Sequence, residues 1–305
     1  MDFIKPDINV DFVNRVRLAL ICSLVAALAG VGSLVIKGGP LYGIDFAGGT
    51  LVQVKFDQAP DVGEIRSALA EEGMGSSVIQ SLGEDKVSIR LKSAEGQADT
   101  ISDDVFAVLG QRFGQDRVTL ELVEMVGPQV GADMRRKGML SILYAMVGIL
   151  VYITLRFQLR FALGALAALI HDIVITVGVF SIFNKEFTLP IIAALLTIIG
   201  YSLNDTIVVY DRIRENVRRM PKEQLSIVVN NSINQTLSRT ILTSGTTLLV
   251  VLCLFLLGGE VIHDFSFALI VGVIVGTYSS IYIASPILLL GGRGKAAARA
   301  SARQG

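Results

Sequence analysis

The chain has 305 residues, of which 52% are hydrophobic, and it carries 27 basic and 27 acidic side chains. This composition is too apolar for an ordinary soluble protein and is typical of a polytopic membrane protein. We therefore expect a membrane-embedded protein with no nucleic acid partner.

Six apolar runs reach or approach about 20 residues, the length with which a helix crosses a bilayer. These runs are Leu18–Ile36, Met139–Leu155, Phe161–Phe183, Leu189–Tyr210, Thr240–Gly258 and Phe265–Leu290. They predict a polytopic α-helical membrane protein with six transmembrane helices, the first over 18–36 and the other five within 139–290. Cys22 and Cys253 lie in two of these runs, at a spacing that fits neither a disulfide framework nor a metal site. We expect no metal.

The first run has two features of a signal peptide. Arg15 and Arg17 precede it, and the stretch that ends at Ala29 offers a cleavage site. However, the apolar run continues through Ile36, so cleavage would fall inside it. We predict an uncleaved first helix that follows an N-terminal segment of residues 1–17.

Residues 37–138, between the first two runs, are predicted to form a separate domain. Within it, positions 41–130 carry 15 acidic and 7 basic side chains. Strand and helix patterns alternate along the domain. The strands are 51–56, 77–82, 86–91 and 118–126, and the helices are 61–72 and 100–113. The resulting order, βαββαβ, is that of a ferredoxin-like α+β unit. Both histidines lie elsewhere, so we expect binding or a mechanical role rather than an enzyme.

This domain opens on Gly43-Ile44-Asp45-Phe46-Ala47-Gly48-Gly49. Glycines permit tight turns and close approaches between backbones. On composition alone, the segment is interpreted as a glycine-rich entry into the first strand.

Two of the predicted spans contain ionisable side chains. Asp205 lies in the run 189–210, and His171 and Asp172 lie in the middle of the run 161–183. A carboxylate inside a span costs a few kcal/mol by insertion scales, and such groups usually mark proton or ion pathways. A static interhelical hydrogen bond is the alternative for each. Adjacent helix residues project about 100° apart, so we expect Asp172 rather than His171 to point into a site, at the contact with a partner subunit.

Arg239 begins the fifth span at the end that Asp205 also approaches. Arg239, Thr243 and Thr246 or Thr247 recur at helical spacing and predict a polar stripe, from which the long Arg239 side chain can extend inward to approach Asp205. Protonation of Asp205 would then release Arg239, which gives two states that a proton gradient could bias. The alternative is that Arg239 is an ordinary anchor at the membrane surface. In the last run, Gly272 and Gly276 have the GxxxG spacing that allows close helix packing.

The placement of basic residues predicts the orientation. Segments rich in Lys and Arg fall on one side of the membrane if there are six helices, and the positive-inside rule places that side in the cytoplasm. These segments are 1–17, 156–160, 212–222 and the tail 291–305. Both termini are therefore predicted to be cytoplasmic and the acidic domain extracytoplasmic. Arg135, Arg136 and Lys137 disagree, but later helices tolerate such exceptions.

Four segments resemble the SecF family of protein-export membrane proteins. They are GIDFAGG at 43–49, the pair His171-Asp172, YSLNDTIVVYDRIREN at 201–216 and SRTILTSGTT at 238–247. The resemblance covers nearly the whole chain. This family works with SecD, and both belong with the RND superfamily of proton-driven transporters.

The resemblance implies an auxiliary subunit of the Sec protein translocase in a bacterial inner membrane. Such a subunit uses the proton motive force, with no other cofactor, to promote preprotein export on the outer side. Its implied partners are SecD, the SecYEG translocon, a YidC-type insertase and unfolded preprotein. The candidate proton-relay residues are Asp205, Arg239, Asp172, Asn204 and His171. The family-motif residues are Gly43, Asp45, Phe46, Gly48, Gly49, Asp211 and Arg212.

Two other functions compete with this one. The first is a self-sufficient RND-type exporter of small molecules or lipids, and the second is a scaffold that moves no protons. Six helices and a single outer domain look like half of an RND unit, which disfavours the exporter. The ionisable Asp205 disfavours the scaffold. From the residues alone, Asp211, Arg212 and Arg214 are expected to form a solvated helix end.

Overall fold

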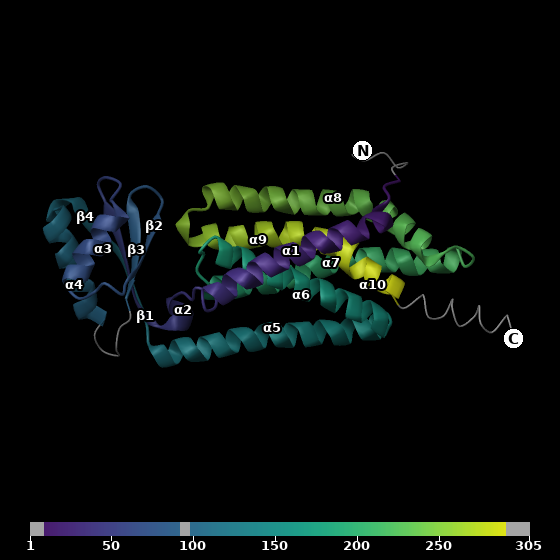
Figure 1. Cartoon of the computed structure of the whole chain (residues 1–305), viewed down its shortest axis with the longest axis horizontal. Coiled ribbons are helices and arrows are strands. Elements are labelled where there is room, and N and C mark those ends of the chain that lie inside the picture. The colour runs from purple at the N-terminus through teal and green to yellow at the C-terminus, as the bar shows by residue number, and fades with distance from the viewer. Residues whose placement is uncertain (1–8, 92–97, 291–305) are drawn as a thin grey trace. The chain divides into compact units, whose positions relative to one another are not determined.

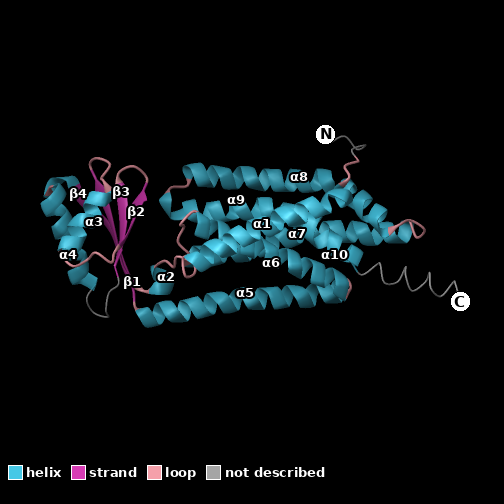
Figure 2. Cartoon of the chain, in the orientation of Figure 1, coloured by secondary structure: helices cyan, strands magenta, loops and turns pink. Residues whose placement is uncertain are grey.

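A computed structural model describes residues 9–91 and 98–290 (Figure 1). The predicted basic tail and most of the predicted N-terminal segment lie outside these residues. The described chain divides into two compact units, one made from parts of Met1–Pro40, Ser141–Lys185 and Pro190–Gly305, and the other from Leu41–Leu140 and Glu186–Leu189. Among the described residues, strands occur only in the second unit, within residues 49–126 (Figure 2).

The first unit is helical, and the described residues include six helices long and apolar enough to cross a membrane. They are α1 (Phe12–Ile36), α5 (Pro128–Arg156), α6 (Leu159–Ile182), α7 (Leu189–Arg219), α8 (Leu225–Leu257) and a last helix that runs through α9 (Glu260–Ser279), η2 (Ser280–Ala284) and α10 (Ser285–Leu290). The predicted membrane fold class is confirmed. The segment η2 is a π-helical turn within this last helix.

Some helices extend well beyond the apolar runs. The helix α8 begins at Leu225, whereas the apolar run begins at Thr240. Its polar first half is held by side-chain bonds to the start of α1: Asn230 Oδ1 accepts from the Phe12 amide at 2.9 Å, and Asn234 Oδ1 accepts from the Val10 amide at 2.8 Å. Hydropathy reports only the apolar part of such a helix, so this extension was missed.

The helices of the first unit pack closely. The fully buried Tyr210 lies in a core with Phe161, and its hydroxyl donates to the Ala284 carbonyl at 3.1 Å. Where α1 meets α6, Gly30 and Gly178 face each other, and a Cβ on Gly30 would lie 2.7 Å from the Gly178 Cα. Only glycine permits this approach, since no side chain fits between the two backbones.

The second unit contains β1 (Gly49–Phe56), α3 (Val62–Glu71), β2 (Val78–Leu82), β3 (Lys86–Leu91), α4 (Ala98–Phe113), η1 (Gln115–Arg117) and β4 (Val118–Val126). The sheet order is β2-β3-β1-β4, with all neighbouring strands antiparallel. This confirms the predicted ferredoxin-like βαββαβ unit. Alternate residues Val52 and Val54 of β1 are fully buried beneath Ile65 and Leu69 of α3, as a strand period of two requires.

Candidate proton-relay site

Asp205 lies in the middle of α7 and is only 2% exposed. Its Oδ2 accepts a hydrogen bond from Ser244 Oγ on α8 at 3.1 Å. The hydroxyl of Thr277, on α9, lies 2.7 Å from the same Ser244 Oγ. Hydroxyls from two other helices, α8 and α9, are therefore linked in series to this carboxylate of α7. A serine hydroxyl both donates and accepts, so this chain suits either protonation state of Asp205.

Asp172 forms a second buried site. It lies on α6, is 1% exposed, and its Oδ2 accepts from Ser202 Oγ at 2.6 Å and from Ser279 Oγ at 2.8 Å. Its Oδ1 lies 3.0 Å from His171 Nδ1. Asp172 is the more deeply buried of the two, as expected, with its side chain 1% exposed against 12% for His171, although the His171 ring also contacts this carboxylate. The expected partner contact of Asp172 is wrong, because this carboxylate is enclosed within the chain.

The two sites share α7 and α9. Ser202 and Asp205 lie about one turn apart on the same face of α7, while α9 supplies Thr277 to one site and Ser279 to the other. The GxxxG prediction is confirmed, because a Cβ on Gly276 would lie 3.0 Å from the Ser202 Cβ. The π-helical turn η2 begins directly after Ser279. Such turns are frequent at functional sites.

Among the described residues, no hydrogen bond joins Thr243 or Thr246 of the predicted polar stripe on α8 to Asp205. The Thr243 and Thr246 hydroxyls donate to the Arg239 and Leu242 carbonyls of their own helix, each at 2.9 Å. Arg239 is exposed, and no ion pair joins it to Asp205 among the described residues. The buried face of α8 lies one residue further on, at Thr240 and Ser244. Helical spacing in the sequence is compatible with either face of α8, and only the packing of the helices shows which one is buried.

The remaining motif residues of α7 lie at its surface. Asn204 is exposed, unlike its neighbour Asp205. Asp211 is half exposed and lies 3.8 Å from Arg156 Nη2, while Arg212 pairs with Glu215 at 2.8 Å. These residues border a charged groove of about 700 Å³ that is lined by Arg156, Asp211, Arg214, Glu215, Arg218 and Arg219. Exposed pairs of this kind contribute little to stability. Asp211 and Arg212 are partly solvated as expected, but they do not end the helix, because α7 continues to Arg219.

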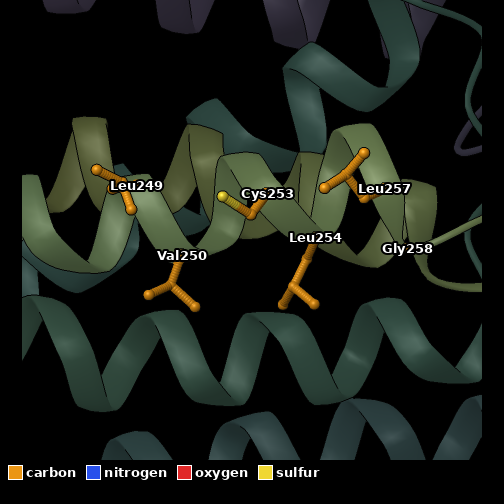
Figure 3. A pocket seen from close by; sticks show the side chains of 6 residues that line it. All are labelled: Leu249, Val250, Cys253, Leu254, Leu257 and Gly258. Carbon is orange, nitrogen blue, oxygen red and sulfur yellow. The ribbon is translucent and has the colours of Figure 1, made fainter.

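A second groove, of about 360 Å³, follows the last turns of α8 (Figure 3). It is lined by Leu249, Val250, Cys253, Leu254, Leu257 and Gly258. These side chains are apolar, so the groove offers no polar group to orient a specific ligand. Among the described residues, no group of three His, Cys, Asp or Glu side chains could hold a metal ion.

The residues Gly43–Gly49, here named the GG segment, form a tight turn before β1. Its middle is the short helix α2 (Ile44–Ala47), and Gly48 and Gly49 have φ values of +71° and +122°. A Cβ on Gly48 would lie 2.8 Å from the Pro128 Cα, at the start of α5. The glycine-rich entry into β1 is therefore present as expected. In addition, Asp45 Oδ2 accepts from the Leu189 amide at 2.8 Å, which the sequence did not indicate.

Two family models match this chain. The model described as "Protein export membrane protein SecD/SecF, C-terminal" covers residues 107–293, and the "SecD/SecF GG Motif" covers residues 39–60. The chain belongs to the SecD/SecF family. The GG segment and the helices that carry Asp172 and Asp205 all fall within these two matches.

Curated SecD/SecF relatives resemble the chain over most of its length. A protein translocase subunit SecF of Magnetococcus marinus is 50% identical and covers 94% of each chain. A protein of the same name from Calditerrivibrio nitroreducens is 45% identical and covers 95% of this chain and 96% of that protein. A third, from Pseudomonas aeruginosa, is 42% identical and covers 92% of this chain and 91% of that protein.

Solved SecDF structures share the fold. SecDF of Thermus thermophilus, a translocon-associated membrane protein, has a TM-score of 0.87 and 36% identity over 95% of this chain. SecDF in a super-membrane-facing form has a TM-score of 0.70 and 38% identity over 97%. This chain spans 40% of the length of each SecDF chain.

Proposed function

We propose that this chain is an auxiliary subunit of the Sec protein translocase and that, with SecD, it uses the proton motive force to promote preprotein export. The observation that carries this proposal is Asp205, a carboxylate 2% exposed in the middle of a membrane-length helix, within a family of protein-export proteins. Ionisable groups inside spans are costly and mark proton pathways. We assign the chain no enzymatic reaction.

The proton is the switch in this proposal. When Asp205 is charged, it accepts from Ser244 and attracts Arg239, which lies exposed on the same helix as Ser244. When Asp205 is protonated, that attraction ends and Arg239 is released. The two states have different preferred positions for α7 against α8, so a proton gradient biases an equilibrium between them.

His171 and Asp172 form a second station of this relay. The His171 side chain is 12% exposed, against 1% for Asp172, so the imidazole is the group that a proton reaches first. The two ring nitrogens of an imidazole can each bind or donate a proton. The hydroxyls of Ser202 and Ser279, which bond to Asp172, then connect the pair to α7 and α9.

The proposed partners cover the exposed faces of α7 and α8. This chain matches 40% of the length of each SecDF chain, so most of those chains lies outside the match. We propose that a SecD subunit supplies the unmatched part and packs against the faces that carry Asn204 and Arg239. SecYEG, a YidC-type insertase and unfolded preprotein complete the set of proposed partners.

Isolation of the native complex tests this assignment. The chain, tagged and extracted in mild detergent, is expected to co-purify with SecD and SecYEG. Recovery of a homo-oligomer free of both would instead favour the RND-type exporter of small molecules or lipids. The family match and the share of each SecDF chain that is covered support the first outcome.

The proposed orientation places both termini in the cytoplasm of a bacterium and the ferredoxin-like unit outside its inner membrane. A periplasm-dependent reporter inserted at Glu84, in the turn between β2 and β3, is expected to be active. The same reporter at Lys222, between α7 and α8, is expected to be silent, because the basic residues of that loop stay inside. A cytoplasm-dependent reporter provides the control, and the reverse pattern at both positions would contradict the orientation.

A further inference from the structure

Residues Glu186–Leu189, which lead into α7 and include its first residue, are joined to the GG segment and the residues just before it. The Phe187 amide donates to the Leu41 carbonyl at 2.7 Å, and the Gly43 amide donates to the Phe187 carbonyl at 2.9 Å. Glu186–Leu189 accordingly belong to the same compact unit as the GG segment and the sheet. The sequence predicted only a turn between two spans here.

Asp45 extends this connection to the helix itself. Its Oδ2 accepts from the amide of Leu189, which is the first residue of α7, at 2.8 Å. The first amides of a helix have no partner within the helix, and an aspartate that accepts from one of them stabilises the end of the helix. Its negative charge is also favourable at the positive end of the helix dipole. The GG segment thus caps the helix that carries Asp205.

Further contacts stabilise the connection between the GG segment and the residues before α7. Arg90 of β3 pairs with Glu186 and donates to the Tyr42 carbonyl, and both charged side chains are largely buried, at 8% and 16% exposed. Burial lowers the pKa of Arg90, but a guanidinium keeps its proton at any physiological pH. The rings of Phe46 and Phe187 lie 6.2 Å apart.

Gly43 suits the same geometry. A Cβ at this position would lie 2.6 Å from the Thr188 Cγ2 and 3.5 Å from the Phe187 carbonyl oxygen. A side chain at position 43 would therefore force the Thr188 side chain to move, and glycine lets the GG segment lie against residues 187–188 without that shift.

We propose that the GG segment is a clamp on the first turn of α7, through which movement of the ferredoxin-like unit and the position of Asp205 are coupled. The helix is continuous from Leu189 to Arg219, so a shift of its first turn is passed along about 24 Å of rigid helix to Asp205. Asp45 is a positioning residue in this coupling and takes no proton itself. The proposal rests on the proposed function and adds the route of coupling to it.

The test compares three variants of the full chain in complex with its SecD partner. Asp45→Ala removes the cap. Asp45→Asn keeps an oxygen acceptor, and Asn caps helices as well as Asp does. Asp61→Ala is the matched control, because Asp61 caps α3 in the same unit by accepting from the Gly63 amide at 2.7 Å. Two quantities are measured: hydrogen exchange of the amides in the first turn of α7, and gradient-stimulated preprotein export in membrane vesicles.

For Asp45→Ala we expect exchange in the first turn of α7 to be about fivefold faster, the factor that corresponds to an N-cap worth about 1 kcal/mol, together with a clear loss of stimulated export. Asp45→Asn and Asp61→Ala are expected to keep both properties. The proposal is overturned if Asp45→Ala keeps full stimulation, if Asp45→Asn loses it equally, or if Asp61→Ala lowers export as much. Exchange does not depend on proton transfer, so it reports the clamp even if Asp205 carries no proton.

Discussion

Replacement of Asp205 with Asn is expected to abolish the export that the proton gradient stimulates, while the protein still inserts and still assembles with its partners. Asn has the size of Asp, and its carbonyl oxygen can accept the bond from Ser244 Oγ that Asp205 Oδ2 accepts at 3.1 Å. The packing of α7 against α8 is therefore retained. What is lost is the change of charge, because an amide does not titrate.

The measurement is preprotein export in inverted membrane vesicles, with and without an imposed proton gradient. In the Asp205→Asn vesicles, export without a gradient should equal that of the unmodified protein, and the gradient should add nothing. Glu215→Gln is the control, because it removes a carboxylate from the same helix that forms only exposed pairs with Arg212 and Arg219. Full stimulation in Asp205→Asn vesicles would rule out the relay.

Replacement of Gly30 with Val is expected to prevent α1 from packing on α6. A Cβ at this position would lie 2.7 Å from the Cα of Gly178, a contact with backbone that no change of rotamer relieves. Overpacking in a tight core costs about 1–3 kcal/mol even when side chains can adjust, so a backbone clash should exceed that range. We expect much less folded protein in the membrane and a lower melting temperature of the purified remainder.

A matched control lies on the same helix. At Gly32, an added Cβ would meet nothing within 4 Å, and Val at that position adds the same mass and the same helix preference. Gly32→Val should therefore accumulate and melt like the unmodified protein. Equal losses from both substitutions would show that valine in α1 impairs insertion in general, and that the contact with Gly178 is not the cause.

The sequence was sufficient for the fold because its signals are local. Apolar runs of spanning length located six helices, and the alternation within β1 and the periodicity of α3 predicted a βαββαβ unit that the sheet order confirms. The GxxxG spacing of Gly272 and Gly276 likewise marked a face of α9 that packs closely on α7. Each of these patterns is complete within one segment.

The details of the relay depend on how neighbouring helices are rotated, which no single segment determines. The spacing from Arg239 to Thr243 and Thr246 marked one polar face of α8, but the hydrogen-bond partner of Asp205 is Ser244, which that spacing does not include. Ser202 and Ser279, which bind Asp172, could not be selected from the other serines of the chain. Intramembrane carboxylates can be found from sequence, but their neutral partners need the structure.

The contact between Asp45 and the first turn of α7 was missed for a similar reason. The two residues are 144 positions apart, and neither the glycines nor the short turn before α7 indicates the other. A capping aspartate is usually sought next to its own helix, whereas this cap comes from a distant segment of the chain.

Proton movement through the purified complex tests the central claim most directly. The chain and its SecD partner would be reconstituted into liposomes that contain a pH-sensitive dye, and an acid pulse would be applied outside. Faster acidification of the lumen than in empty liposomes is predicted for the unmodified complex and for Glu215→Gln, with no acceleration for Asp205→Asn. Equal acidification with and without the Asp205 carboxylate would contradict the account.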